Sequence, residues 1–218
     1  MSASPGPQKE PATIKWLAAP TSDVWLEQAI AHPLELLIDH AHCERKAAGA
    51  VVQLMFRYLC EPGLGEVLSP LAREELEHFE RVLTLIKARG RYLEPLPAPP
   101  YGAALAKQIR RNEPQRMLDS FLVSGLIEAR SHERMSLLAA HMQDQELRQL
   151  YEDLLASEAR HFGLYWLESK KRFPIETIEA RLKELSITEA QILSGIPAVG
   201  RDIRFHSAGV VTSIVCSA

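Results

Sequence analysis

Apolar side chains recur at helical spacing along most of this chain, and proline or glycine interrupts the pattern at intervals. Between Pro33 and Cys60, for example, the apolar residues at positions 37, 41, 48, 51 and 55 form a single stripe. Such a stripe, with polar residues on the other face, is typical of an amphipathic helix that packs on a core. The pattern therefore predicts an all-α protein.

Residues that start or stop helices set the expected boundaries. Ser69-Pro70 is an N-cap followed by a first-turn proline, Gly90 is a typical C-terminal cap, and Phe173-Pro174 ends a helix. We therefore expect four long helices, over residues 33–60, 70–89, 114–142 and 144–172.

The segments between and beyond the long helices are shorter. Residues 91–102 contain too many prolines for a helix, and the segment is too long for a tight turn. It is therefore predicted to form a crossover. No structure is predicted after Gly195. Short helices are expected over residues 22–31, 103–110 and 175–185, with a last turn at 188–193.

The length and composition are those of one globular domain. Of the 218 residues, 46% are hydrophobic and 24% are charged, and no apolar run approaches the ~20 residues that a membrane span requires. We expect a disordered tail over residues 1–14, one domain over 15–195, and a C-terminal tail of unknown structure over 196–218.

The first residues and the cysteines bear on the compartment. The N-terminal sequence lacks the apolar segment of a secretory signal. Cys43, Cys60 and Cys216 are too few and too scattered for a disulfide framework, which points to a reducing environment. A cytoplasmic protein that does not contact membranes is therefore expected. The net charge of −3 decides little, because it includes any carboxylates that bind metal.

Two of the long helices carry the same pair of ionisable residues. Residues 75–78 and 158–161 both read Glu-x-x-His, and positions i and i+3 share one helical face. The other two helices each have one glutamate on the apolar stripe. Buried carboxylates without a partner are costly, so four of them predict a common cationic partner. The predicted metal ligands are Glu44, Glu75, His78, Glu128, Glu158 and His161.

The order Glu, Glu-x-x-His, Glu, Glu-x-x-His is that of ferritin-like di-iron carboxylate bundles. Glu44 and Glu75 are 31 residues apart and Glu128 and Glu158 are 30 apart, as expected for two similar helical hairpins. Oxygen and imidazole ligands suit iron or manganese better than zinc, and we favour two iron ions. We therefore expect a ferritin-like four-helix bundle with a long crossover between the second and third long helices, plus short flanking helices.

Other ionisable residues on these helices lack a partner at the right spacing. We expect surface or hydrogen-bonded histidines at His40, His42, His132 and His141. A solvated face is expected for Glu74, Glu77 and Glu80.

Four blocks resemble the motifs of the tRNA 2-methylthio-isopentenyladenosine hydroxylases, the MiaE family: LLIDHAHCERKAA, REELEHFERV, GLIEARSHER and SEARHFGLY. The resemblance covers roughly residues 15–195. It implies a monooxygenase that hydroxylates the isopentenyl side chain of the modified adenosine next to the tRNA anticodon. It also implies O2 as co-substrate, two electrons from an external donor such as a reductase or ferredoxin, and the six residues above as ligands.

The metal ligands leave two other functions open. Iron oxidation and storage, or peroxide handling, uses much of the same ligand order in bacterioferritin and manganese catalase. A di-iron hydroxylase of another apolar substrate, such as a quinone, is the second alternative, and it would need a membrane-facing apolar surface.

Basic residues distant in sequence are expected to meet at one end of the bundle. The crossover makes the second and third long helices parallel, so both start at the pole where the first and fourth end. Counting from Pro70 at 1.5 Å per residue puts Glu75 and His78 about 8–12 Å from that pole. We predict that the tRNA anticodon stem-loop binds there through Arg57, Lys107, Arg110, Arg111, Lys170, Lys171 and Arg172.

Overall fold

The computed structural model describes residues 14–197 and 200–209, and within them the chain is helical with no β-strand. The expected all-α class is confirmed. A 3₁₀ turn at Gly200–Asp202 follows the last helix. The helices are α1 (Asp23–Ala31), α2 (Pro33–Arg57), α3 (Leu64–Ala88), α4 (Tyr101–Ala106), α5 (Gln115–His141), α6 (Gln145–Arg172) and α7 (Ile175–Ser194).

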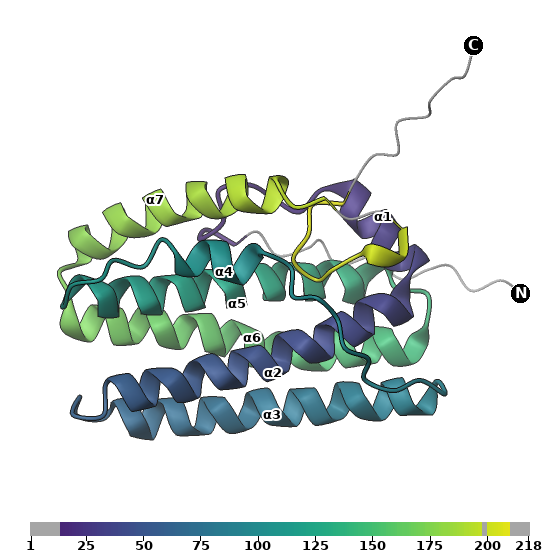
Figure 1. Cartoon of the computed structure of the whole chain (residues 1–218), viewed down its shortest axis with the longest axis horizontal. Coiled ribbons are helices and arrows are strands. Elements are labelled where there is room, and N and C mark those ends of the chain that lie inside the picture. The colour runs from purple at the N-terminus through teal and green to yellow at the C-terminus, as the bar shows by residue number, and fades with distance from the viewer. Residues whose placement is uncertain (1–13, 198–199, 210–218) are drawn as a thin grey trace, which may run out of the picture.

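The long helices form two hairpins, α2 with α3 and α5 with α6 (Figure 1). Residues 89–100 cross from the end of α3 to α4, which leads back to the start of α5, so α3 and α5 run in the same direction (Figure 1). The short helix α4 and the last helix, α7, pack on α5. This is the predicted ferritin-like arrangement, with its long crossover between the two hairpins.

Several predicted helix ends are confirmed. The Asp144 side chain caps α6 by accepting a hydrogen bond from the Leu147 amide at 3.0 Å. The same helix ends at Arg172, directly before Phe173-Pro174. Gly90 follows the end of α3 with φ +70°, a conformation that glycine adopts without a steric penalty.

The predicted start of α3 at Pro70 is wrong. The helix begins at Leu64, directly after Gly63 (φ +74°), so Pro70 lies inside it. Leu64 and Leu68 are buried, and their core contacts stabilise the turns before the proline. The Ser69-Pro70 signal is local and does not contain those contacts.

Two shorter segments also differ from the prediction. Helix α4 is Tyr101–Ala106 rather than 103–110. Helix α7 is continuous through residue 194, whereas a helix to 185 and a separate turn at 188–193 were expected. Its continuity follows from one buried face that includes Leu185, Glu189 and Leu193.

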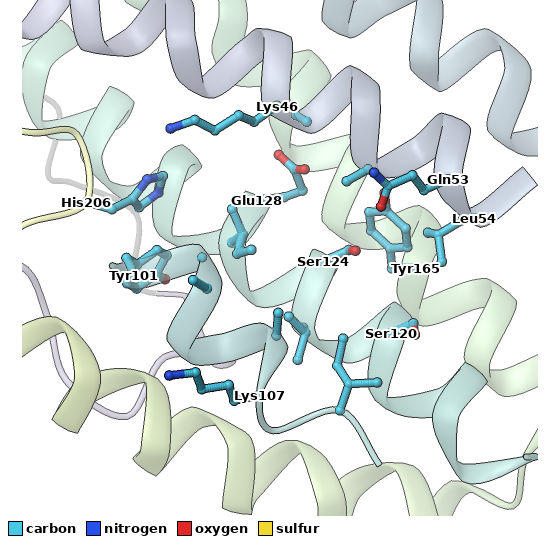
Figure 2. A pocket seen from close by; sticks show the side chains of 18 of the residues that line it. Lys46, Gln53, Leu54, Tyr101, Lys107, Ser120, Ser124, Glu128, Tyr165 and His206 are labelled. Carbon is cyan, nitrogen blue, oxygen red and sulfur yellow. The ribbon is translucent and has the colours of Figure 1, made fainter. Parts of the chain in front are cut away.

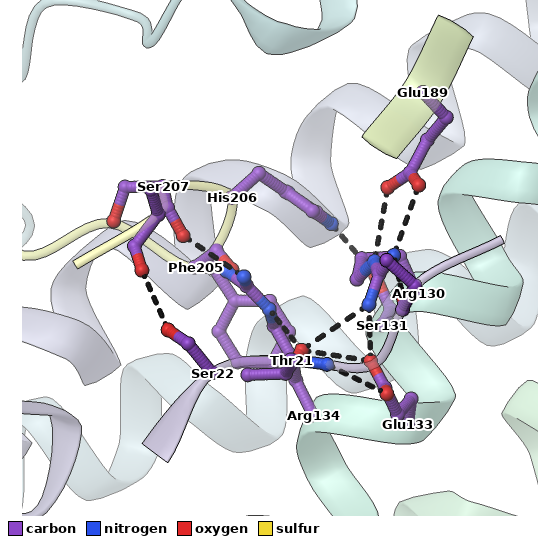
Figure 3. Close-up of polar contacts among 12 residues, drawn as sticks. Thr21, Ser22, Arg130, Ser131, Glu133, Arg134, Glu189, Phe205, His206 and Ser207 are labelled. Carbon is purple, nitrogen blue, oxygen red and sulfur yellow. Dashed lines mark hydrogen bonds and ion pairs between the residues drawn. The ribbon is translucent and has the colours of Figure 1, made fainter. Parts of the chain in front are cut away.

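The segment 203–208, which lies beyond the predicted boundary at Gly195, packs into the bundle. Ile203 and Phe205 are fully buried, and the Phe205 amide donates to Asp39 Oδ2 of α2 at 2.7 Å. Arg134 of α5 donates to the carbonyls of Phe205 and Ser207 (Figure 3). The packed unit therefore continues past the limit set by helical periodicity.

Three expectations concern the ends of the chain and its surroundings. Among the described residues, no helix is both long and apolar enough to cross a membrane. Cys43 and Cys60 are free thiols, while Cys216 lies outside the described residues. Of the tail predicted over 1–14, all but the last residue lies outside them as well.

Candidate metal centre

The six predicted ligands come from all four long helices and are all buried, each with 6% or less of its surface exposed. Glu44 comes from α2, Glu128 from α5, and the two Glu-x-x-His pairs from α3 and α6. Both pairs meet in one cluster: Glu75, His78, Glu158 and His161 offer atoms that all lie within 4.8 Å of one another.

Each histidine of this cluster faces the glutamate of the opposite helix. His161 Nδ1 lies 2.8 Å from Glu75 Oε1, and His78 Nδ1 lies 3.3 Å from Glu158 Oε1. Glu44 Oε2 is 3.6 Å from His78 Nδ1, which joins α2 to the cluster. Five of the six predicted ligands therefore meet in direct contact.

The outer nitrogen of each histidine is held by a hydrogen bond. His161 Nε2 lies 3.0 Å from Glu74 Oε2, so it donates to that carboxylate. The Ser157 hydroxyl donates to the Leu154 carbonyl at 2.8 Å, so its oxygen accepts from His78 Nε2 at 3.1 Å. With both Nε2 atoms held by these contacts, the Nδ1 atoms face the cluster, which is the orientation that metal ligation requires.

The polar atoms at the centre of the cluster lack hydrogen-bond partners among the described residues. These atoms are both carboxylate oxygens of Glu75, Oε1 of Glu158, and Nδ1 of His78 and of His161. Buried polar atoms are rarely left unpaired, because desolvation without a partner is costly. Converging lone pairs on oxygen and imidazole nitrogen fit a pair of divalent cations.

The pKa values of the cluster residues also indicate a need for a bound cation. Burial and the neighbouring glutamates raise the pKa of Glu75 and of Glu128 well above the ordinary value. Burial alone would lower the pKa of His78, but the carboxylates of Glu158 and Glu44 outweigh it and raise the pKa to about 9. With all four glutamates ionised, the cluster would therefore hold more negative charge than its own residues can balance.

Two residues outside the predicted ligand set contact the ligands. His40 was expected to be a surface or hydrogen-bonded histidine, and it is the second of these: it is fully buried, and its Nε2 lies 2.5 Å from Glu44. Its spacing of four residues from Glu44 could have indicated this contact. Glu74 was expected on a solvated face, but it is only 37% exposed and binds His161 of another helix, which no local signal reveals.

Glu128 connects the cluster to a cavity of about 760 Å³ between α2, α4 and α5 (Figure 2). Small and apolar residues form much of the wall, among them Ala47 and Ala50 of α2 and Val123 and Ile127 of α5. Of the described residues that line the cavity, only Glu128 is acidic. The sixth predicted ligand thus faces a space that can admit an apolar group.

Basic residues surround this cavity. Four of the seven predicted tRNA contacts line it: Arg57, Lys107, Arg110 and Arg111. Lys46 and Arg116, which sequence reasoning missed, line it as well. Among the described residues, salt-bridge partners are absent for five of these side chains, here called the rim cations: Lys46, Arg57, Lys107, Arg111 and Arg116.

The other predicted tRNA contacts are placed differently. Arg110 is bound to the buried Asp119, with its Nη2 2.7 Å from Oδ1. Lys170, Lys171 and Arg172 do not line the cavity. Lys171 and Arg172 both pair with Glu168, at 2.5 and 2.6 Å.

The predicted distance from the metal centre to the pole is also too short. Glu75 lies 11 residues after the start of α3 at Leu64, which corresponds to about 16 Å along the helix. The centre is therefore near the middle of the bundle. The cavity reaches it from the side, between α2 and α4.

Known proteins resemble this chain over nearly its whole length. Residues 8–207 match the MiaE family, described as tRNA-(MS[2]IO[6]A)-hydroxylase. The tRNA 2-(methylsulfanyl)-N(6)-isopentenyladenosine(37) hydroxylase of Pseudomonas putida is 41% identical, over 88% of this chain and 92% of its own length. The protein of the same name from Salmonella typhimurium is 28% identical, over 92% of this chain and 91% of its own length.

A solved structure is more similar still. It is described as protein 43 with aldehyde deformylating oxygenase activity from Synechococcus, and it is 71% identical to this chain. The match covers 92% of this chain and 100% of that one, with a TM-score of 0.88. The family match and the Pseudomonas putida relative agree with the two Glu-x-x-His pairs found in one buried cluster. This chain therefore belongs to the MiaE family of tRNA hydroxylases.

Proposed function

We propose that this protein is an O2-dependent di-iron monooxygenase that hydroxylates the isopentenyl side chain of 2-methylthio-isopentenyladenosine next to the tRNA anticodon. One observation carries the proposal: Glu128, a predicted metal ligand, also lines a cavity with apolar walls and basic surroundings. An isopentenyl group on a nucleotide has the matching character, since it is apolar at one end and anionic at the other.

The proposed cofactor is two iron ions held by Glu44, Glu75, His78, Glu128, Glu158 and His161. Bound iron would supply the activation of O2, in a reaction that converts C–H, O2, two electrons and two protons into C–OH and water. The electrons would come from an external reductase or ferredoxin. The buried position of the six residues would keep bulk water away from this chemistry.

Residues of the cavity would bind and orient the substrate. The isopentenyl group would contact the apolar wall near Ile127 and Val123, which lie one and five residues before Glu128 on α5. To reach that depth, the modified base must leave its stack, as bases do in other nucleic-acid-modifying enzymes. The phosphates around the displaced nucleotide would remain outside and meet the rim cations.

The cations differ in how much each is proposed to contribute to tRNA binding. A cation without an acidic partner gains most from a phosphate, so the rim cations are proposed as the main contacts. Arg110 already binds Asp119 and would contribute less. Lys170, Lys171 and Arg172 remain predicted contacts for the stem, because the end of α6 lies at the same pole as the start of α5 (Figure 1). The place of action would be the cytoplasm.

A second candidate function is the deformylation of an aliphatic aldehyde. It is favoured by the 71% identity to the Synechococcus protein, whose description states that activity. The same cavity could admit an apolar aldehyde chain next to Glu128. An uncharged aldehyde would leave the rim cations without a ligand, which is why the tRNA substrate is preferred.

The test compares both substrates on one preparation. The iron-loaded, reduced protein is given O2 and either isopentenylated tRNA or a long aliphatic aldehyde. We expect a hydroxylated nucleoside after digestion of the tRNA, and slow or no release of the formyl carbon. Efficient release of that carbon with unchanged tRNA would overturn the proposal in favour of the aldehyde.

A further inference from the structure

One end of the cavity is made by two stacked rings that come from segments far apart in sequence. The rings of Tyr101 and His206 are nearly parallel, with an interplanar angle of 2° and centroids 4.6 Å apart. In Figure 2 they lie on one side of the cavity, with Leu54 and Tyr165 on the other side and Glu128 between. We call Tyr101 and His206 the end wall.

The end wall is closed from behind by buried polar contacts. Tyr101 donates to Glu189 at 2.8 Å, and Glu189 in turn pairs with Arg130, both fully buried. His206 Nε2 lies 3.3 Å from the Ser131 hydroxyl (Figure 3). Solvent therefore does not lie behind these rings, and a chain that enters the cavity must stop against them.

The backbone around His206 is held firmly in place. Besides the Asp39 and Arg134 contacts of Phe205, the Trp25 indole donates to the Arg204 carbonyl at 3.0 Å. The Ser22 hydroxyl donates to the Ala208 carbonyl at 2.9 Å. A side chain carried on so many backbone contacts cannot move aside easily, so the end wall has a fixed position.

We infer that His206, stacked on Tyr101, limits how far an apolar substrate chain can extend past Glu128, and so selects substrates by chain length. The substrate class is a short apolar side chain, such as a branched five-carbon group, rather than a long linear one. This inference rests on the proposal that the cavity binds the substrate. It assigns a specificity-determining role to a segment for which the sequence predicted no structure.

The test measures the length limit directly with straight-chain primary alcohols of increasing length, by calorimetry on the intact protein. Each added methylene should tighten binding about fourfold until the chain meets the wall, after which the gain stops. In His206→Ala and His206→Asn, the gain should continue to longer alcohols. In His206→Trp, it should stop at a shorter one. His141→Ala, at the end of α5 and outside the cavity, should keep the original limit.

A parallel series replaces the isopentenyl group of an anticodon stem-loop by longer prenyl groups and measures hydroxylation. If the alcohol limit shifts but no stem-loop is hydroxylated, the tRNA function fails while the length limit stands. If stem-loops are hydroxylated but the limit is the same in every folded His206 variant, the inference is wrong. Absence of any length-dependent alcohol binding to the unaltered protein also overturns it. Circular dichroism identifies which variants are folded.

Discussion

Two clusters of charged side chains lie buried in this bundle, and they differ in whether their polar atoms have partners. In the metal cluster, carboxylate oxygens and imidazole nitrogens point at one another without hydrogen bonds. In the second cluster, Arg130 pairs with both Glu189 and Glu133, and Arg134 binds backbone carbonyls (Figure 3). None of its side-chain atoms is among the unpaired buried atoms of the described residues.

The difference separates a ligand site from a structural one. The second cluster contains two arginines and two glutamates, so its formal charges cancel within the protein. The metal cluster contains four glutamates and two histidines, so its carboxylates outnumber the side chains that could neutralise them. Burial of charge is therefore not itself a sign of function, whereas burial of charge without a partner points to a missing cation.

The largest expected effect is the loss of a metal ligand. The unaltered protein reconstituted with iron should bind about two ions per chain. His161→Ala and Glu128→Ala should lose iron and all hydroxylation while staying helical, because the core stripes still pack. Iron analysis, an activity assay and circular dichroism check this. One ion or none in the unaltered protein, or full activity in Glu44→Ala, would show that the six-ligand set is wrong.

The second cluster should respond in the opposite way. Glu189→Ala leaves the buried Arg130 without its main partner and should lower the free energy of unfolding by about 3–5 kcal/mol, measured by denaturant titration. Glu184→Ala on the same helix is the matched control, since it breaks only an exposed pair with Arg181 and should cost less than about 1 kcal/mol. If both variants lost the same free energy of unfolding, the distinction between the two clusters would not hold.

A smaller effect is expected at the border of the metal cluster. Glu74→Gln weakens the hydrogen bond that orients His161 and should reduce iron affinity about 10–100-fold, measured by competition with a chelator. Glu77→Gln, an exposed neighbour on the same helix, should leave affinity unchanged. If the two variants bind iron equally well, Glu74 belongs to the solvated face that the sequence suggested.

The smallest effect concerns the rim cations, which touch neither cluster. Arg57→Ala with Arg111→Ala should weaken tRNA binding and reduce the slope of log K against log salt by about one per lost phosphate contact. Iron content should not change. Lys170→Ala with Lys171→Ala tests the α6 end separately, and Lys87→Ala near the opposite pole is the control. A larger loss from Lys87→Ala than from the rim variants would place the tRNA at the other end.

The sequence alone determined the all-α class, the existence of four long helices, the ligand order and the family resemblance. Glu-x-x-His and helical stripes are local patterns, and their spacing along a helix fixes which residues share a face. For this reason the cluster of Glu75, His78, Glu158 and His161 could be predicted before any packing was known. The spacing of His40 before Glu44 was present too, but a local spacing does not say which way the imidazole turns.

Only the tertiary structure decided what surrounds that cluster. Glu74 meets His161 because α3 and α6 pack side by side, and α3 starts at Leu64 because Leu64 and Leu68 are buried by other helices. His206 reaches the cavity from a segment that has no helical periodicity, held by contacts with residues more than 160 positions away. Such contacts depend on how distant segments pack, and a one-dimensional pattern contains no record of that packing.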